Sequence, residues 1–222
     1  MAEAIRLLDS EGIDGLSMRK LGTRLGAGAA SLYRHVASKD ELIELVLDEV
    51  YGQSRIPAAD DPADWRGVVI ECAHALRTMI LRHPWMATII GGIGSVYFSR
   101  NLMRPSEDML AVVVAAGFSL REANRVTATV FAYVIGTAST EAAWLTMVAR
   151  KGMTEEEWHR EMLPVAARAV QHLPHLRELY ALYAEAHGAD DAGDIGRGRE
   201  EEFTYRLDRI LDGLSTGLSG SR

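Results

Sequence analysis

The segment from Ser17 to Lys39 constrains the fold more than any other part of the sequence. Ser17 is a typical helix N-cap, the apolar residues after it recur at helical spacing, and Gly26 is typical of the position just beyond a helix end. These signals predict a helix of only about two turns. A turn rich in Gly and Ala follows, and then a second short helix from Ala29 to Val36. A short helix, a turn and another short helix are the pattern of a helix-turn-helix.

Helices are also predicted on both sides of this segment. The apolar residues from Ile5 to Leu8 predict a helix before it. Ser38 and Glu41 match an S-x-x-E capping box, which opens a longer helix after it. A stretch rich in Pro and Asp follows that helix and is typical of a domain boundary. We therefore expect one domain over residues 1–50 and a second over residues 51–222.

The chain from Trp65 onward is predicted to be helical. Its apolar residues recur at helical spacing, without the alternating runs that strands need. Ser119 with Glu122, and Thr154 with Glu157, repeat the capping-box pattern. Helices are expected over residues 64–82, 84–91, 102–116, 119–150, 155–172, 174–187 and 199–217. The prediction is an all-α protein, with an N-terminal three-helix domain of the helix-turn-helix type and a C-terminal helical bundle.

The helix-turn-helix segment is basic, whereas the whole chain has a formal net charge of -7. The segment contains no Asp or Glu, and its basic residues are Arg19, Lys20, Arg24, Arg34 and Lys39. The rest of the chain has 19 basic and 31 acidic residues, a net charge of -12. Two interpretations fit this pattern. The segment is either a solvated basic face or a surface that binds nucleic acid through its positive potential.

Cysteine usage and the length of apolar runs indicate the compartment. Cys72 is the only cysteine, so the chain has no internal disulfide and too few thiolates for a cysteine zinc site. The N-terminus lacks the basic start and apolar stretch of a signal peptide, and no run of about 18 apolar residues is present. We therefore expect a cytoplasmic protein with no membrane partner.

Residues 15–43, GLSMRKLGTRLGAGAASLYRHVASKDELI, resemble the N-terminal hallmark of the TetR family of repressors. The resemblance rests on the Leu-Tyr-x-His element that ends at His35, the Ser-Lys pair that ends at Lys39, and the Leu-Gly before the turn. It implies that Tyr33, His35 and Lys39 contact DNA phosphates. It also implies that Arg19 reaches a base edge, where a guanidinium can bind guanine O6 and N7.

The start of the predicted recognition helix has few polar groups with which to read bases. Gly28, Ala29 and Ala30 offer DNA only methyl groups and a close backbone approach. We therefore expect much of the sequence specificity to come from DNA shape. The predicted DNA-binding residues are Ser17, Arg19, Lys20, Gly28, Ala29, Ala30, Ser31, Tyr33, Arg34, His35 and Lys39.

Two later phrases, AAGFSLREAN and FTYRLDRILDGL, resemble the tetracycline-repressor type of C-terminal domain. That resemblance implies a homodimer, in which helix 8 and the final helix pair with their copies in a second subunit. One short recognition helix addresses few base pairs, so two copies on a pseudo-palindromic operator are expected. The residues implied for dimer or core contacts are Ala132, Ile135, Gly136, Ser139 and Ala143 on one helix, and Phe203, Leu207, Ile210 and Leu211 on the other.

The same resemblance implies a pocket for a small-molecule effector inside the C-terminal domain. Aromatic and Met residues there suit a mostly apolar molecule, although each is also an ordinary core residue. Ile90 stands where tetracycline repressors place the histidine that binds a magnesium-chelated drug, so we expect no metal and no other cofactor. The predicted ligand-binding residues are Cys72, Leu76, Trp85, Met86, Tyr97, Phe98, Met103, Met109, Phe131, Trp144 and Met147.

Transcriptional regulation is the function that these observations favour. No GxSxG, HExxH, P-loop or Rossmann motif is present, and the carboxylates around His159 fit a solvated helix start. We therefore predict no enzyme activity and no catalytic residues. The expected protein is a repressor that leaves its operator when an apolar effector fills the pocket and the fourth helix pivots. The alternative is a helical protein-interaction or scaffold module that does not bind DNA.

Overall fold

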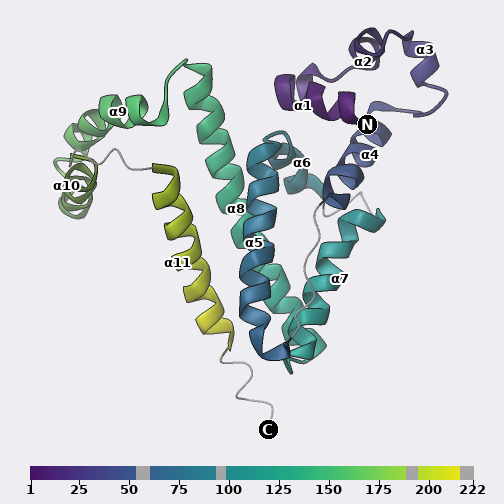
Figure 1. Cartoon of the computed structure of the whole chain (residues 1–222). Helices are drawn as coiled ribbons and strands as arrows, with labels where there is room; N and C mark the ends of the chain where they lie inside the picture. Colours follow the sequence, from purple (N-terminus) through teal and green to yellow (C-terminus); the bar gives the residue numbers. More distant parts are fainter. Residues whose placement is uncertain (54–60, 94–98, 189–194, 216–222) are drawn as a thin grey trace. The chain divides into compact units, whose positions relative to one another are not determined.

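All regular secondary structure in the described residues is helical. The computed structural model describes residues 1–53, 61–93, 99–188 and 195–215, which form eleven α-helices and one short 3-10 helix (Figure 1). No strand occurs in these ranges, so the predicted all-α fold is confirmed. Within the same ranges, no helix is both long enough and apolar enough to cross a membrane.

Four helices, which we call the head, cover the segment predicted to hold the helix-turn-helix. They are α1 (Ala2–Gly15), α2 (Met18–Arg24), α3 (Ala29–Leu32) and α4 (Lys39–Gly52). The prediction of a helix as far as Val36 is wrong, because α3 ends at Leu32 and the chain continues as turns. In these turns the N–H of His35 donates to the carbonyl of Leu32, three residues back. Gly28 gives α3 no capping side chain, and a helix of one turn gains few hydrogen bonds for the residues that it orders.

Longer helices build the rest of the described chain. They are α5 (Trp65–Arg82), α6 (Met86–Ile93), α7 (Arg100–Ala115), α8 (Leu120–Arg150), α9 (Glu155–Ala169), α10 (Pro174–Gly188) and α11 (Ile195–Ser215), with η1 (Pro62–Asp64) before α5. Both predicted capping boxes are present: Ser119 Oγ accepts the N–H of Glu122, and Thr154 Oγ1 accepts the N–H of Glu157. Every helix predicted beyond residue 60 is found. The helix ends shift by up to four residues, with the largest shift at the start of α11, and the predicted end at residue 217 lies outside the described residues.

The described residues form two compact units. The first contains Met1–Ala142 and the chain from Leu207 onward, and the second contains Ala143–Arg206. The helices α8 and α11 each pass from one unit into the other. The head and the helices α5 to α7 therefore belong to the same unit.

A buried apolar core holds the first unit together. Ile80 of α5, Met109 of α7 and Leu207 of α11 are fully buried, and burial of such a side chain contributes about 1.5–3 kcal/mol. A charged pair crosses this core, because Arg77 donates to both carboxylate oxygens of Glu141, over 2.9 and 2.7 Å. The pair joins α5 to α8 within the first unit.

The head is attached to the core through α4, which packs on α7. The apolar side chains of Val46 and Val50 on α4 are buried. Beside them, Asp48 accepts two hydrogen bonds from Asn101 at the start of α7, one from its backbone N–H and one from its side-chain amide, both 2.9 Å long. A movement of α7 would therefore carry α4 with it.

Candidate nucleic-acid interface

The orientation of α2 is set by its N-cap and its apolar face. Ser17 Oγ accepts the backbone N–H of Lys20 over 3.2 Å, as the N-cap prediction requires. Met18 and Leu21 are buried in the head. Because these two residues face inward, Arg19 and Lys20 between them face solvent.

The turn after α2 depends on a glycine in the left-handed region. Gly26 has a φ of 64°, which a residue with a side chain rarely adopts. Its N–H donates to the carbonyl of Thr23, and the next N–H, from Ala27, donates to the carbonyl of Gly22. This pair of bonds is a Schellman motif, and it confirms the predicted role of Gly26 as the residue beyond the helix end. The turn leads the chain directly into α3.

The end of α3 and the turns after it display the residues predicted to contact DNA. Tyr33 is 54% exposed, and Arg34 and His35 are also exposed. Arg34 donates a hydrogen bond to Ser31 Oγ over 3.1 Å. Gly28 and Ala30 face solvent, and a Cβ added to Gly28 would meet nothing within 4 Å. The side chain of Ala29 lies outside the described residues.

Two of the basic residues are neutralised within the head. Lys20 forms a short ion pair with Glu11 of α1, and Arg24 lies 3.0 Å from Glu11 and 3.5 Å from Glu3. The hydrogen bond from Lys20, assisted by the charges of Lys20 and Arg24, holds the pKa of Glu11 below its usual value. These pairs join α2 to α1, so part of the basic charge of the segment serves the head itself.

The other basic residues are arranged differently. Lys39, at the start of α4, is half-buried, and its Nζ donates to the carbonyl of Ile13 over 2.8 Å. Arg19 is exposed and forms no ion pair or side-chain hydrogen bond within the described ranges. No side chain of the described residues occupies the guanidinium of Arg19, so the whole group can bind a ligand such as DNA.

A shallow hollow of about 450 Å³ follows this surface of α2. It is lined by Asp14, Gly15, Ser17, Arg19, Lys20, Thr23 and Arg24. Thr23 and Arg24 line this hollow beside residues predicted to bind DNA, although the sequence prediction did not include them. The i, i+4 spacing places Thr23 beside Arg19 and Arg24 beside Lys20 on the same face of α2, and this signal would have found them.

The predicted ligand-binding residues do not share one environment. Cys72, Leu76, Trp85, Met86 and Met109 are buried in the core of the first unit, whereas Met103 is 46% exposed. Phe131 is half-buried in the same unit. Trp144 and Met147 are half-buried and belong to the second unit. Tyr97 and Phe98 lie outside the described residues.

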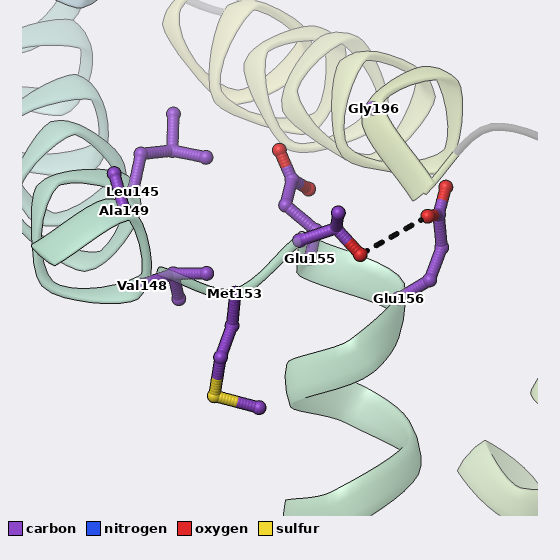
Figure 2. A pocket seen from close by; sticks show the side chains of 8 residues that line it. Leu145, Val148, Ala149, Met153, Glu155, Glu156 and Gly196 are labelled. Carbon is purple, nitrogen blue, oxygen red and sulfur yellow. Dashed lines mark hydrogen bonds between the residues drawn. The ribbon is translucent and has the colours of Figure 1, made fainter. Parts of the chain in front are cut away.

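A hollow of about 530 Å³ occurs in the second unit, among the end of α8 and the starts of α9 and α11 (Figure 2). Leu145, Val148 and Met153 form its apolar side, and Glu155 and Glu156 form its acidic side. No predicted ligand-binding residue lines it. Glu155 is bound by Arg199, whose guanidinium also stacks 5.2 Å from the ring centre of Trp144.

The residues implied for dimer or core contacts divide between these two roles. On α8, Ala132, Gly136 and Ala143 are exposed, whereas Ile135 and Ser139 are half-buried. On α11, Phe203, Leu207 and Leu211 are buried within the chain, and Ile210 is half-buried. The three exposed residues of α8 are thus open to a partner, and the α11 residues are mainly core.

Two family models match the sequence. The model for bacterial regulatory proteins of the tetR family matches residues 1–46, and the model for the tetracyclin repressor-like C-terminal domain matches residues 57–218. An HTH-type transcriptional regulator of Saccharopolyspora erythraea is 40% identical over 144 residues, which cover 65% of this chain and 60% of that relative. An HTH-type transcriptional repressor of Streptomyces coeruleorubidus is 30% identical over 224 residues, covering 99% of this chain and 77% of the relative.

Solved structures show the same fold. ActR of Streptomyces coelicolor in complex with actinorhodin has a TM-score of 0.71 and 28% identity, over 98% of this chain and 95% of that chain. BioQ with its double-stranded DNA operator has a TM-score of 0.56 and 30% identity, over 68% of this chain and 88% of that chain. The ActR match extends over both the head and the larger helical part that follows it.

Proposed function

Because the chain belongs to the TetR family of bacterial regulatory proteins, we propose that it is a DNA-binding transcriptional repressor whose operator affinity depends on a small molecule. One observation carries the proposal: Arg19, Tyr33, Arg34 and His35 are exposed together along α2, α3 and the turns after α3. The segment that holds them contains no acidic residue. Exposed cations and hydroxyls on a short helix pair suit the phosphates and base edges of a major groove.

Each predicted residue has a distinct role in this proposal. Tyr33, His35 and Lys39 bind phosphates, which fixes the register of the head on the duplex. Arg19 binds a base edge and gives direct sequence preference. Ser17, Lys20, Ser31 and Arg34 add contacts at the edges of the groove, and the small residues at the start of α3 allow a close backbone approach. The remaining specificity comes from DNA shape.

In this proposal the protein binds its operator as a homodimer. The exposed face of α8 carries Ala132, Gly136 and Ala143, and small residues let two helices approach closely. Two heads in one dimer would contact half-sites about one helical turn apart, on a pseudo-palindromic operator in the cytoplasm.

The proposed effector is a small, mostly apolar molecule that binds in the C-terminal part of the chain. The ActR complex with actinorhodin supports such a site, because that related protein holds a small molecule. The contact between α4 and α7, with its hydrogen bonds from Asn101 to Asp48, offers a path from the core to the head. An effector that favours one position of α7 would shift the head and lower operator affinity.

The proposal is tested by selecting duplex DNA from a random pool with the full-length protein. We expect an enriched inverted repeat that the protein binds more tightly than random duplex, with an affinity that falls steeply as salt rises. Arg104→Ala, which removes an exposed arginine of α7 outside the head, is the matched control and should leave both affinities unchanged. If no sequence is enriched and duplex binding is absent at low salt, the proposed function is wrong.

The scaffold alternative is not favoured, because the relatives are named as transcriptional regulators or repressors. The same names support the absence of enzyme activity. Selection of duplex DNA also separates the two possibilities, since a scaffold module would enrich no operator.

A further inference from the structure

A carboxylate of the head binds two side chains of the core. Asp9 lies on α1, and its Oδ1 is 2.7 Å from Nδ1 of His83 and 2.7 Å from Nε1 of Trp85. His83 is 6% exposed and Trp85 is 4% exposed, so both partners are buried. These two residues flank Pro84 in the turn between α5 and α6. One oxygen atom therefore links α1 to this turn.

The chemistry of the three groups fixes the direction of both hydrogen bonds. An ionised carboxylate only accepts, and an indole N–H only donates. Nδ1 of His83 must therefore carry its proton in order to bind Asp9. Hydrogen bonds to an ionised group are stronger than neutral ones. Two donors meet the same oxygen of Asp9, so the contact restricts the orientation of α1 as well as its distance from the turn.

The turn that presents the two donors is held firmly by the core. The N–H of His83 donates to the carbonyl of Met79, and the N–H of Met86 donates to the carbonyl of His83. Proline restricts the backbone between the two donors. Met86 is fully buried. The donors therefore move with the core.

On the other side of the contact, α1 is coupled to the DNA-reading helix α2. Leu7 and Leu8 of α1 are buried in the head, and Glu11 of α1 pairs with Lys20 and Arg24 of α2. A change in the angle of α1 would consequently change the direction in which Arg19 points.

We propose that Asp9 is a positioning residue for operator binding, which sets the orientation of the head by accepting hydrogen bonds from His83 and Trp85. This inference rests on the proposed function and adds a second link to the contact of α4 with α7. Two heads must match two half-sites at once, so specific binding needs a defined head orientation. Binding to random duplex depends mainly on charge and does not need it.

The test uses full-length variants, the selected duplex and a random duplex of equal length. Trp85→Phe keeps an aromatic ring in the core and removes the N–H, and it should weaken binding to the selected duplex about tenfold without weakening binding to random duplex. Asp9→Ala removes the acceptor of both bonds and should also weaken selective binding, although the loss of a negative charge favours random DNA. The double variant should lose no more than about twofold beyond the larger single effect, because both changes break the same contact.

Matched variants separate positioning from general stability. Trp65→Phe makes the same change at a second buried tryptophan, the first residue of α5. Trp65 packs edge-on against Phe118 and makes no hydrogen bond to the described part of the head, so selective binding should stay unchanged. His83→Asn retains an N–H near the position of Nδ1 and should restore most of the selectivity that His83→Leu loses. Melting curves identify any variant that fails to fold, and Trp85→Phe then decides the question.

The outcomes also distinguish this inference from the function on which it rests. If the unaltered protein selects no duplex, the proposed function is wrong and the positioning role falls with it. If the protein selects a duplex and Trp85→Phe and Asp9→Ala bind it normally, only the positioning role is wrong. An equal loss on selected and random duplex would likewise overturn the positioning role, because it would reflect a loss of folded protein.

Discussion

The Nζ atom of Lys39 donates a hydrogen bond of 2.8 Å to the backbone carbonyl of Ile13. Lys39 opens α4, and Ile13 lies in the last turn of α1, just after the kink at Gly12, whose φ is 69°. Carbonyls at the C-terminal end of a helix carry partial negative charge and favour a cation. The residue proposed to bind a DNA phosphate therefore also joins two helices of the head.

Replacing Lys39 should consequently lower both stability and DNA affinity. Lys39→Met removes the ammonium and keeps most of the aliphatic stem, and we expect it to destabilise the protein by roughly 1–2 kcal/mol in urea unfolding. Affinity for selected and random duplex should fall to a similar extent, because a phosphate contact carries no sequence information. Lys39→Arg keeps the charge and should retain most of the affinity. Unchanged stability in Lys39→Met would show that the bond to Ile13 contributes nothing.

Arg19 should affect sequence preference rather than overall affinity. Its guanidinium is exposed and makes no ion pair within the described ranges, so Arg19→Ala removes no contact inside the head. We expect a loss of about 1–3 kcal/mol on the selected duplex, with relaxed preference at one position in each half-site. Titrations against duplexes that vary at each position provide the measurement. A uniform loss on every sequence would place Arg19 on the phosphate backbone instead.

The acid sensitivity of the head should depend on Glu11. Lys20 and Arg24 hold the pKa of Glu11 below 4.5 in the folded protein. As pH falls, Glu11 therefore binds its proton at a higher pH in the unfolded chain than in the folded protein. The stabilisation that the ion pairs of Glu11 provide is present above about pH 4.5, and it is lost as pH falls through the lower folded pKa. Glu11→Gln should lower stability at neutral pH, and its difference from the unaltered protein should shrink in acid.

A second glutamate, far from Lys20 and Arg24 in the sequence, is the control for Glu11→Gln. Glu107→Gln changes an exposed glutamate of α7 and should leave the acid limb of the stability curve unchanged. Denaturant midpoints measured at several pH values give the comparison. A constant difference between Glu11→Gln and the unaltered protein down to the lowest pH would exclude the ion pairs of Glu11 as the cause.

The local signals of the head were predictable because each depends on a few neighbouring atoms. Ser17 and Ser38 cap helices as expected, since an N-cap needs only a side-chain oxygen and the N–H three residues later. Gly26 ends α2 because the left-handed region strongly favours glycine. The end of α3 was predicted wrongly, because its apolar spacing continues to Val36 although the helix ends at Leu32 and residues 33–35 form turns.

Contacts between distant segments could not be predicted in the same way. The basic charge of the helix-turn-helix segment was evident from composition, but the pairing of Lys20 and Arg24 with acids of α1 depends on how two helices pack. Asp9 and His83 are 74 residues apart, and neither belongs to a motif. Their contact requires the head and the core to be placed together, which residue spacing does not specify.

Cys72 should be almost inert in the folded protein. Burial, together with the negative charges of Asp108 and Glu71, raises the pKa of its thiol to about 12, and the side chain is 4% exposed. The thiolate is the reactive form. At pH 8 the folded protein should therefore hold about a thousandfold less thiolate than an unfolded chain, and a thiol reagent should modify Cys72 at least that much more slowly. Since Cys72 is the only cysteine, the rate of thiol modification with and without denaturant measures this ratio. The same experiment tests the predicted ligand-binding role of Cys72, because fast modification of the folded protein would mean that solvent and small molecules reach α5 through an open cavity.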